Sequence, residues 1–171
     1  MGELKMRKWF LRMLVFSTLT IGLMVGPMTP VSASDSSLSA VREANSKFHS
    51  LAAARHAGYA PLLPCFDLPG VGGMGQHYVK TALLNGKVEA LHPQAMVYEV
   101  DEGQLKLVAV EYIIPFTMWD SATAPTLFGH TFTHNTTLGL WALHAWLWRT
   151  NPLGTFANYN PNVKMCPGRQ A

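Results

Sequence analysis

Charged residues are scarce in this sequence, and the short motifs of several enzyme classes are missing from it. Only 13% of its 171 residues are Asp, Glu, Lys or Arg, so an acidic residue inside an apolar segment stands out. The chain has no G-x-S-x-G nucleophile elbow, no H-E-x-x-H motif and no C-x-x-C pair. These absences exclude, at the level of motifs, the hydrolases, zinc proteases and dithiol redox proteins that carry them.

Positive charge is concentrated at the amino end of the chain. Residues 1–33 contain four of the 13 Lys and Arg residues but one of the 10 Asp and Glu residues, so residues 34–171 carry no formal net charge. No basic surface is then expected to follow a phosphate backbone, which argues against nucleic-acid binding. Five of the nine methionines also lie before residue 34, and this excludes a Met-rich copper carrier.

The same amino-terminal segment predicts export. It has a basic start, an apolar run of roughly 14 residues and small residues around Val31-Ser32-Ala33, which is the pattern of a signal peptide cleaved after Ala33. The run is short for a membrane span, which needs about 20 residues. We therefore expect residues 1–33 to be a signal peptide and the rest to be periplasmic or secreted, with no membrane span. An uncleaved amino-terminal anchor is the alternative.

Cysteine is nearly absent, since Cys65 and Cys166 are the only two in the chain. Two cysteines in an exported chain predict a disulfide, and closing a loop of about 100 residues contributes up to roughly 4.7 kcal/mol in the chain-entropy model. Two free thiols or a pair of metal ligands are the alternatives. A disulfide would hold the carboxyl-terminal tail beside the glycine-rich segment that begins at Gly70.

Gly70, Gly72 and Gly75 match the G-x-G-x-x-G spacing of a dinucleotide-binding turn. That turn has to follow a buried strand and open a helix. Here a proline-rich segment precedes the glycines, and β-forming residues follow them. A nucleotide site is therefore rejected, and the glycines are interpreted as the mobile start of a strand that carries His77.

Residues 34–171 predict a single α+β domain. Apolar residues at three- and four-residue steps predict a helix over 38–57 that ends at Gly58. Alternation from residue 76 predicts strands joined by hairpins at 85–86 and 102–103, and a central strand over 138–150. Residues 117–139 are expected to be a long irregular loop. We expect the helix to pack on a curved antiparallel sheet of four to six strands, cone- or barrel-like, with a pocket on its concave face.

The hairpin at 102–103 gives two acidic residues different surroundings. Its register places Glu99 across from Lys106, which predicts a cross-strand ion pair. A carboxylate inside an apolar face requires protonation, a partner or a metal. Glu111 is predicted to be such a carboxylate, because it shares a face of its strand with Leu105, Leu107, Ala109 and Ile113.

Three polar residues interrupt apolar patterns, namely His77, Glu111 and His144. If both hairpins belong to one meander, position 94 faces both His77 and Glu111, so the two share a row of the sheet. Pro93 offers the alternative that 85–94 is a wide loop. Two imidazoles and one carboxylate in an apolar pocket are typical ligands of Zn²⁺, Mn²⁺ or Fe²⁺ with positions left open for water or substrate.

Further residues are candidates to complete this site. His130 and His134 have a spacing that places both on one face of an extended segment, where they could supply further ligands. Tyr78, Tyr98, Tyr112 and Trp146 are candidates to line a ligand pocket. The predicted function is an exported protein that binds a divalent transition metal, with a small metalloenzyme as its catalytic form.

Three alternatives use the same residues without a metal. His77 and Glu111 can form an acid–base pair, or a structural hydrogen-bond network in which Glu111 pairs with His77 or Arg149. In the third, the protein is a non-catalytic binding module that holds a small apolar or aromatic molecule.

The chain resembles an uncharacterised family of exported bacterial proteins. The resemblance rests on the blocks M-G-x-H-Y from Met74, V-E-Y from Val110 and H-x-W-x-W-x-x-N-P-x-G-x-F from His144, in this order. It covers nearly all of residues 40–166. It implies one bacterial domain, with the blocks centred on His77, Glu111, His144 and a tail around Asn151 and Asn160, and it implies no particular activity.

Overall fold

The computed structural model describes residues 33–168. The predicted signal peptide lies almost wholly outside the described residues. None of the helices within 33–168 has the length and apolar character needed to cross a membrane.

The helical segment comes first, as predicted, but it is interrupted. Helix α1 (Ala33–Asn45) is followed by the 3₁₀ turn η1 (Ser46–His49) and by helix α2 (Leu51–His56). The break occurs at Ser50, whose extended backbone ends the turn and whose hydroxyl accepts a hydrogen bond from the amide of Ala53 to cap α2. Gly58 follows α2 with a φ of +93°, which confirms it as the residue that ends the helical segment.

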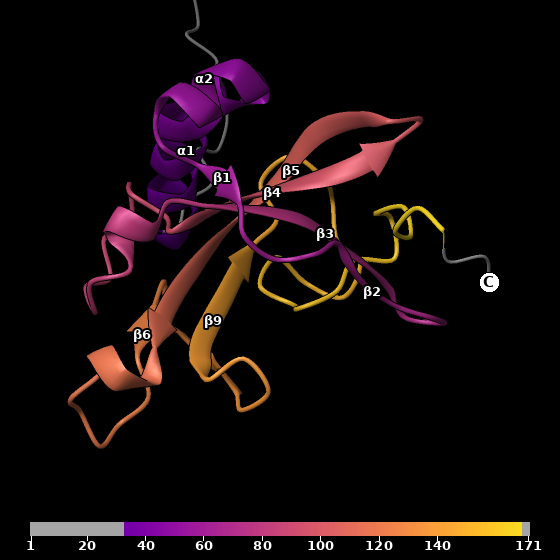
Figure 1. Ribbon diagram of the computed structural model, residues 1–171. Coiled ribbons are helices and arrows are strands. Elements are labelled where there is room, and N and C mark those ends of the chain that lie inside the picture. The colour runs from indigo at the N-terminus through magenta and orange to yellow at the C-terminus, as the bar shows by residue number, and fades with distance from the viewer. Residues whose placement is uncertain (1–32, 169–171) are drawn as a thin grey trace, which may run out of the picture. The chain divides into compact units, whose positions relative to one another are not determined.

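The strands form one large antiparallel sheet with the helices beside it (Figure 1). The strand order is β1-β3-β4-β5-β9-β8, and β2 pairs with β3 outside this path. The path ends at β1 and β8, so the sheet is not closed, and the cone- or barrel-like prediction is wrong in that respect. The strands of this sheet are β1 (Ala60–Pro61), β2 (Phe66–Leu68), β3 (Gly72–Val79), β4 (Ala95–Asp101), β5 (Gln104–Pro115), β8 (Thr133–Asn135) and β9 (Leu140–Ala145).

The predicted loop over 117–139 contains short strands. Strands β6 (Thr126–Leu127) and β7 (His130–Thr131) pair with each other as a separate two-stranded sheet, and β8 joins the main sheet. The 3₁₀ turn η3 (Phe116–Met118) precedes them. Strand β9 lies between β5 and β8, as predicted for a central strand, although it ends at Ala145 and residues 146–150 leave the sheet.

One of the two predicted hairpins is confirmed. Asp101 pairs with Gln104 across Glu102 and Gly103, whose φ values of 50° and 76° suit a tight hairpin turn. The hairpin at 85–86 is wrong, because β3 ends at Val79 and a wide connection containing the 3₁₀ turn η2 (Thr81–Leu83) leads to β4. The side-chain amide of Gln94 donates to the carbonyls of Leu83 and Lys87 and so holds this connection together.

A bulge between β4 and β5 decides which side chains face the site. The register runs as predicted from Val100↔Leu105 to Tyr98↔Leu107, and then shifts to Val97↔Ala109. Because one extra residue is inserted in β5, the alternation of side chains changes face at this point. Leu105 and Leu107 therefore pack on the helix side, whereas Glu111 lies on the other face with Ile113.

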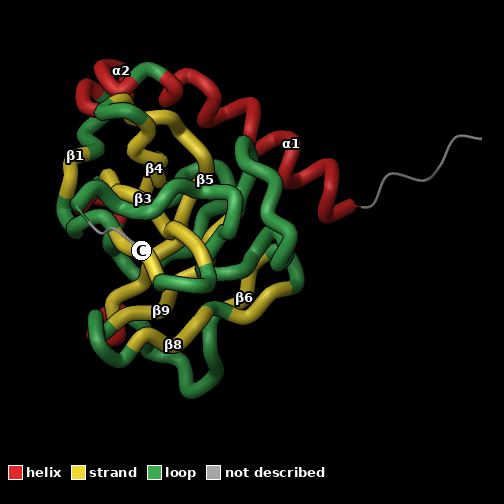
Figure 2. Tube along the Cα trace, turned by 90° about the vertical axis from the view of Figure 1, so that its right-hand side faces the viewer, coloured by secondary structure: helices red, strands yellow, loops and turns green. Residues whose placement is uncertain are grey.

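The two faces of the sheet have different roles. The helix-covered face carries the main apolar core, with Tyr78, Met96, Tyr98 and Tyr112 packed against Phe48. Figure 2 shows helices α1 and α2 beside the β1, β4 and β5 end of the sheet, with β8 and β9 at the opposite end. The face away from the helices holds the polar cluster described next.

Candidate metal centre

Three strands deliver the three polar residues to one place. His77 lies on β3, Glu111 on β5 and His144 on β9. Glu111 and His144 are directly opposite each other in the β5–β9 ladder. Strand β4 separates β3 from β5 and presents Ala95 opposite Glu111 and Val97 opposite His77. His77 and Glu111 therefore lie in neighbouring rows, and His77 reaches Glu111 diagonally across β4, past the small side chain of Ala95. The prediction that the two residues share one row is wrong.

The functional atoms of this cluster lie close together. Nε2 of His77 is 3.4 Å from Nε2 of His144 and 3.4 Å from Oε2 of Glu111, and Nε2 of His144 is 3.5 Å from Oε1 of Glu111. One ligand atom from each residue lies within 4.8 Å of the other two, an arrangement that could hold a metal ion. Among the described side chains this is the one such group of His, Cys, Asp and Glu.

Burial determines the protonation of the cluster. His77, Glu111 and His144 are 1%, 5% and 1% exposed. Burial raises the pKa of Glu111 to about 8, and it lowers the pKa of His77 to about 4, with a smaller opposing effect from the backbone of Gly75. Burial and the neighbouring His77 lower the pKa of His144 well below its usual value. Without a cation, the site therefore favours neutral imidazoles and a neutral carboxyl group at pH 7.

No permanent cation neutralises Glu111 among the described residues. Its two ion-pair contacts are the two imidazoles, and both of these rings favour the neutral form. Arg149, a partner considered from the sequence, forms an ion pair with the buried Glu99 instead. Nδ1 of His144 is buried without a hydrogen-bond partner, and Nδ1 of His77 makes no hydrogen bond of ordinary geometry despite the nearby Gly75.

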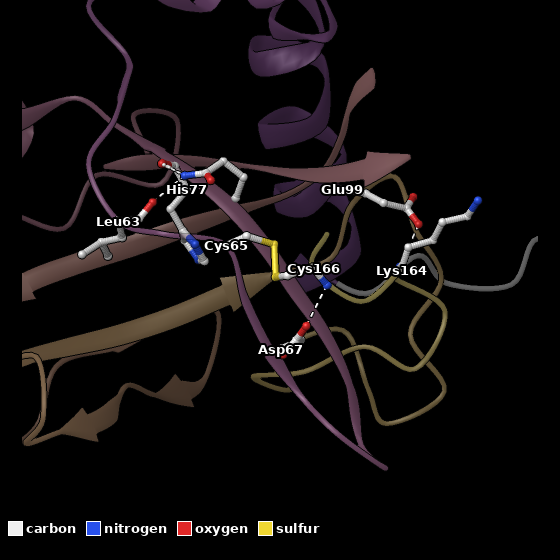
Figure 3. The surroundings of a disulfide bond; sticks show 8 residues. Leu63, Cys65, Asp67, His77, Glu99, Lys164 and Cys166 are labelled. Carbon is white, nitrogen blue, oxygen red and sulfur yellow. Dashed lines mark hydrogen bonds between the residues drawn. A yellow bond between two sulfur atoms is a disulfide. The ribbon is translucent and has the colours of Figure 1, made fainter. Parts of the chain in front are cut away.

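The predicted ion pair between Glu99 and Lys106 is wrong, although their register is right. Glu99 accepts from the guanidinium of Arg149 and from the backbone amide of Lys164 at 2.9 Å. Lys106 pairs with Asp101. Glu99 is fully buried and faces the tail, so its partners come from segments distant in sequence. Figure 3 shows the contact between Glu99 and Lys164.

The glycine-rich segment holds His77 in place through close packing. Gly72, Gly73 and Gly75 are buried within β3, so they are not a mobile start to the strand. A Cβ atom on Gly75 would lie 2.7 Å from the carbonyl oxygen of Tyr98, and φ at this residue is +103°. Gly73 exchanges backbone hydrogen bonds with Asn160 of the tail. At position 75, two residues before His77, only glycine allows both the positive φ and the close approach of the Tyr98 carbonyl.

The predicted disulfide between Cys65 and Cys166 is confirmed (Figure 3). The backbone amide of Cys166 also donates to the carboxylate of Asp67 at 2.7 Å. Phe66 lies in sequence between Cys65 and Asp67, both of which are bound to Cys166. Its ring packs edge-on against the ring of His77, with centroids 5.8 Å apart. The disulfide therefore fastens the tail to the segment that covers His77.

The cluster forms part of the wall of an open cavity of about 280 Å³. Sequence reasoning missed most of this wall, because many of its members come from short or irregular segments without a periodic pattern. Tyr159, for example, belongs to the tail, and Thr133 to a strand of three residues. Besides the cluster, the wall contains Leu63, Phe66, Met74, Ile113, Thr133, Asn135, Thr137, Leu138, Leu140, Ala142, Asn158 and Tyr159.

The structure does not bring His130 and His134 to the cluster. His134 pairs with Trp141 in the β8–β9 ladder, three residues before His144, so it lies on the opposite face of the sheet. It stacks on Phe116 at 4.5 Å between ring centroids and is exposed. His130 is also exposed and stacks on Phe156 at 4.0 Å.

The predicted aromatic pocket residues also lie elsewhere. Tyr78, Tyr98 and Tyr112 belong to the core on the helix side. The hydroxyls of Tyr98 and Tyr112 donate to the carbonyls of Phe48 and Ala90 at 2.8 and 2.6 Å, so they complete the core. Trp146 stacks on His144 with an interplanar angle of 11°, yet it does not line the cavity. The three tyrosines therefore lie across the sheet from the cluster, whereas Trp146 packs directly on the ring of His144.

Comparisons of the chain with protein-family models, with curated proteins and with solved structures gave no match. The resemblance to exported bacterial proteins therefore stays a prediction. Function has to be inferred from the site itself.

Proposed function

We propose that this protein is exported and binds a divalent transition metal through His77, Glu111 and His144. The supporting observation is that two buried imidazoles and a buried carboxyl group turn their ligand atoms toward one another. A divalent ion would neutralise the carboxylate and satisfy both ring nitrogens at once. The disulfide and the absence of a membrane-crossing helix in residues 33–168 are compatible with an exported protein.

The chemistry of the three side chains favours Zn²⁺ among the divalent ions. Two imidazoles and one carboxylate are the protein ligands of the His₂Glu class of catalytic zinc sites. Glu111 approaches His77 through Oε2 and His144 through Oε1, so both carboxylate oxygens face the imidazoles. Zn²⁺ is therefore the proposed ion, ahead of Mn²⁺ and Fe²⁺, which more often take six ligands.

Three protein ligands beside an open cavity are typical of catalytic zinc sites, whereas structural sites have four protein ligands. When bound, the ion would act as a Lewis acid on a molecule in the cavity. The chain's own residues would hold the ion and place Thr133 and Asn158 at the wall of the same cavity. This arrangement supports the proposal that the metal-binding protein is a small metalloenzyme.

Metal content tests the proposal directly. The full chain is produced with its amino-terminal segment, purified from the periplasm, and analysed for bound elements and for Zn²⁺ affinity. We expect one Zn²⁺ per chain, and we expect His77→Ala, Glu111→Ala and His144→Ala each to weaken binding by more than about 100-fold, the upper end of what loss of an outer-shell partner costs. His130→Ala and His134→Ala are matched controls that should retain the ion.

The two main alternatives give other results in the same experiment. A non-catalytic module or an acid–base pair requires no metal, so the purified protein would contain none and Zn²⁺ would leave its thermal unfolding unchanged. Loss of metal in the His130→Ala or His134→Ala variants would contradict the assigned ligand set. Retention of stoichiometric metal by His144→Ala would contradict it as well.

A further inference from the structure

A second cavity of about 210 Å³ lies next to the 280 Å³ cavity that contains His77, Glu111 and His144, which is called the metal pocket below. The wall of the second cavity contains no polar side chain, since every contributing residue is apolar or glycine. Four residues line both cavities, namely Leu63, Ile113, Leu138 and Leu140, so the two cavities are adjacent. Taken together as the joined cavities, they extend from the three proposed ligands to a purely apolar end formed by Leu62, Val79, Leu84 and Pro115.

The polar groups of the joined cavities are gathered at one end. Apart from the two histidines, Glu111 is the single ionisable acid or base that lines the metal pocket, while Tyr159 offers a phenol. Thr133 donates a hydrogen bond to Asn158 at 3.2 Å beside the cluster. Bound Zn²⁺ and the Glu111 carboxylate would together leave one positive charge that no other residue of the wall neutralises.

The apolar end is accessible at its rim. Leu62 and Leu138 are 54% and 40% exposed, although large aliphatic side chains are among the residues most often buried. The two leucines line the same cavity and expose apolar surface there. A hydrocarbon group lying there would remove the surface of both leucines from water.

We propose, on the basis of the proposed metal site, that the natural ligand is a small amphiphile with one anionic, metal-binding head and one hydrocarbon chain. The head lies against the metal and beside Thr133 and Asn158. The chain passes Ile113 and Leu140 and ends between Leu62 and Leu84. A ligand with a second charge is disfavoured, because the second cavity offers nothing to pair with it.

A homologous series of alkyl hydroxamates tests this ligand class, because the metal-binding head stays constant while the chain grows. Binding to the Zn²⁺-loaded protein is measured by calorimetry from acetohydroxamate to decanohydroxamate. Each methylene buried against apolar side chains should increase affinity by up to about fourfold. The increase should stop once the chain is longer than the joined cavity.

Exposed leucines provide variants that leave the metal ligands untouched. Leu62 lines the second cavity alone, so Leu62→Ser should reduce octanohydroxamate affinity by about tenfold or more while acetohydroxamate affinity stays the same. Leu138 lines both cavities, so Leu138→Ser should reduce octanohydroxamate affinity by more than it reduces acetohydroxamate affinity. Leu153 is 55% exposed and lines neither cavity, so Leu153→Ser is the matched control. Thermal unfolding of each variant checks that it folds.

The outcomes separate this inference from the proposed function. If the protein binds Zn²⁺ and acetohydroxamate but shows no gain with chain length, the amphiphile proposal is overturned and the metal site stands. If no metal is retained, both fail. If chain-length dependence is present but unchanged in Leu62→Ser and Leu138→Ser, the chain lies elsewhere and the proposal is overturned.

Discussion

Glu111 and His144 lie directly opposite each other on β5 and β9, with Oε1 of the carboxylate 3.5 Å from Nε2 of the imidazole. Burial acts on the two groups in opposite directions, raising the pKa of Glu111 and lowering that of His144. Each group therefore favours its neutral form, and no buried charge remains for a residue of the chain to neutralise. Such a pair suits a metal ion, because a bound cation would favour the deprotonated carboxylate of Glu111, while the imidazole of His144 is already unprotonated.

The stability of the metal-free protein should fall as the pH rises from 6.5 to 8. Glu111 has a pKa of about 8 in the folded state and an ordinary value of 4.5. In this window the folded state holds a proton that the unfolded state has lost, so the free energy of unfolding falls by roughly 1.4 kcal/mol per pH unit. Urea unfolding in EDTA at several pH values measures this slope.

Glu111→Gln should remove that slope, because an amide does not titrate and has nearly the same shape. Glu43→Gln, an exposed glutamate on α1, is the matched control and should keep it. The imidazoles contribute below this window, since the lowered pKa values of His77 and His144 cost stability as the pH falls below 6.5. A slope unchanged by Glu111→Gln would contradict the assigned protonation.

Binding of Zn²⁺ at pH 7 should release about one proton from the protein. Glu111 is mainly protonated at this pH and must lose its proton to bind the ion, whereas both histidines are already neutral. Affinity should therefore rise with pH up to about 8 and then level off. Calorimetry in buffers of different ionisation enthalpy counts the released protons, and a count near two or near zero would contradict this prediction.

The sequence predicted the site well because its three residues are exceptions to strong patterns. His77, Glu111 and His144 each interrupt an apolar strand, which is why they were singled out. The pairing of β5 with β9, which sets Glu111 opposite His144, was not predicted. The bulge beside Val108 was not predictable, because bulges depend on packing against the rest of the sheet and not on alternation. It moves Glu111 to the face opposite Leu107 and so changes the neighbours that were expected.

The residues that surround the site were harder to predict. Tyr159 and Asn158 lie in the tail, where the chain has no period that could place them. His134 was misplaced because its position depends on pairing with Trp141, and that register is set by the turn between β8 and β9. The hairpin at 85–86 failed because the Asn-Gly pair forms a bend inside a wider loop, where Gly86 has a φ of +76°.

Gly75→Ala should destabilise the protein by about 3 kcal/mol or more and weaken metal binding. The new Cβ would lie 2.7 Å from the carbonyl oxygen of Tyr98, and a φ of +103° is unfavourable for alanine. Relief of that clash would shift β3 and displace His77 from its partners. Gly139→Ala is the matched control, because Gly139 also has a positive φ but no atom within 4 Å of the new Cβ.

Gly139→Ala should therefore cost only about 1–2 kcal/mol and leave Zn²⁺ affinity unchanged. Chemical unfolding and metal titration of the two variants give the comparison. Equal losses of stability in both variants would show that backbone conformation, and not the approach of Tyr98, is what requires glycine at position 75.

Removal of the disulfide should lower both stability and metal affinity. Cys65 and Cys166 are 101 residues apart in sequence, and the chain-entropy model assigns up to about 4.7 kcal/mol to a loop of that length. The double variant Cys65→Ser, Cys166→Ser should unfold at a lower denaturant concentration. Zn²⁺ affinity should fall because Phe66, next to Cys65, packs on His77 and limits its movement.

Phe66→Leu separates these two effects of the disulfide. This variant keeps the covalent link but loses the edge-on contact with the ring of His77, so it should weaken Zn²⁺ binding more than it lowers stability. Phe156→Leu, which removes a ring stacked on the exposed His130, is the matched control and should leave Zn²⁺ affinity unchanged. If the double serine variant binds Zn²⁺ normally while Phe66→Leu does not, position 66 is held by β2–β3 pairing alone.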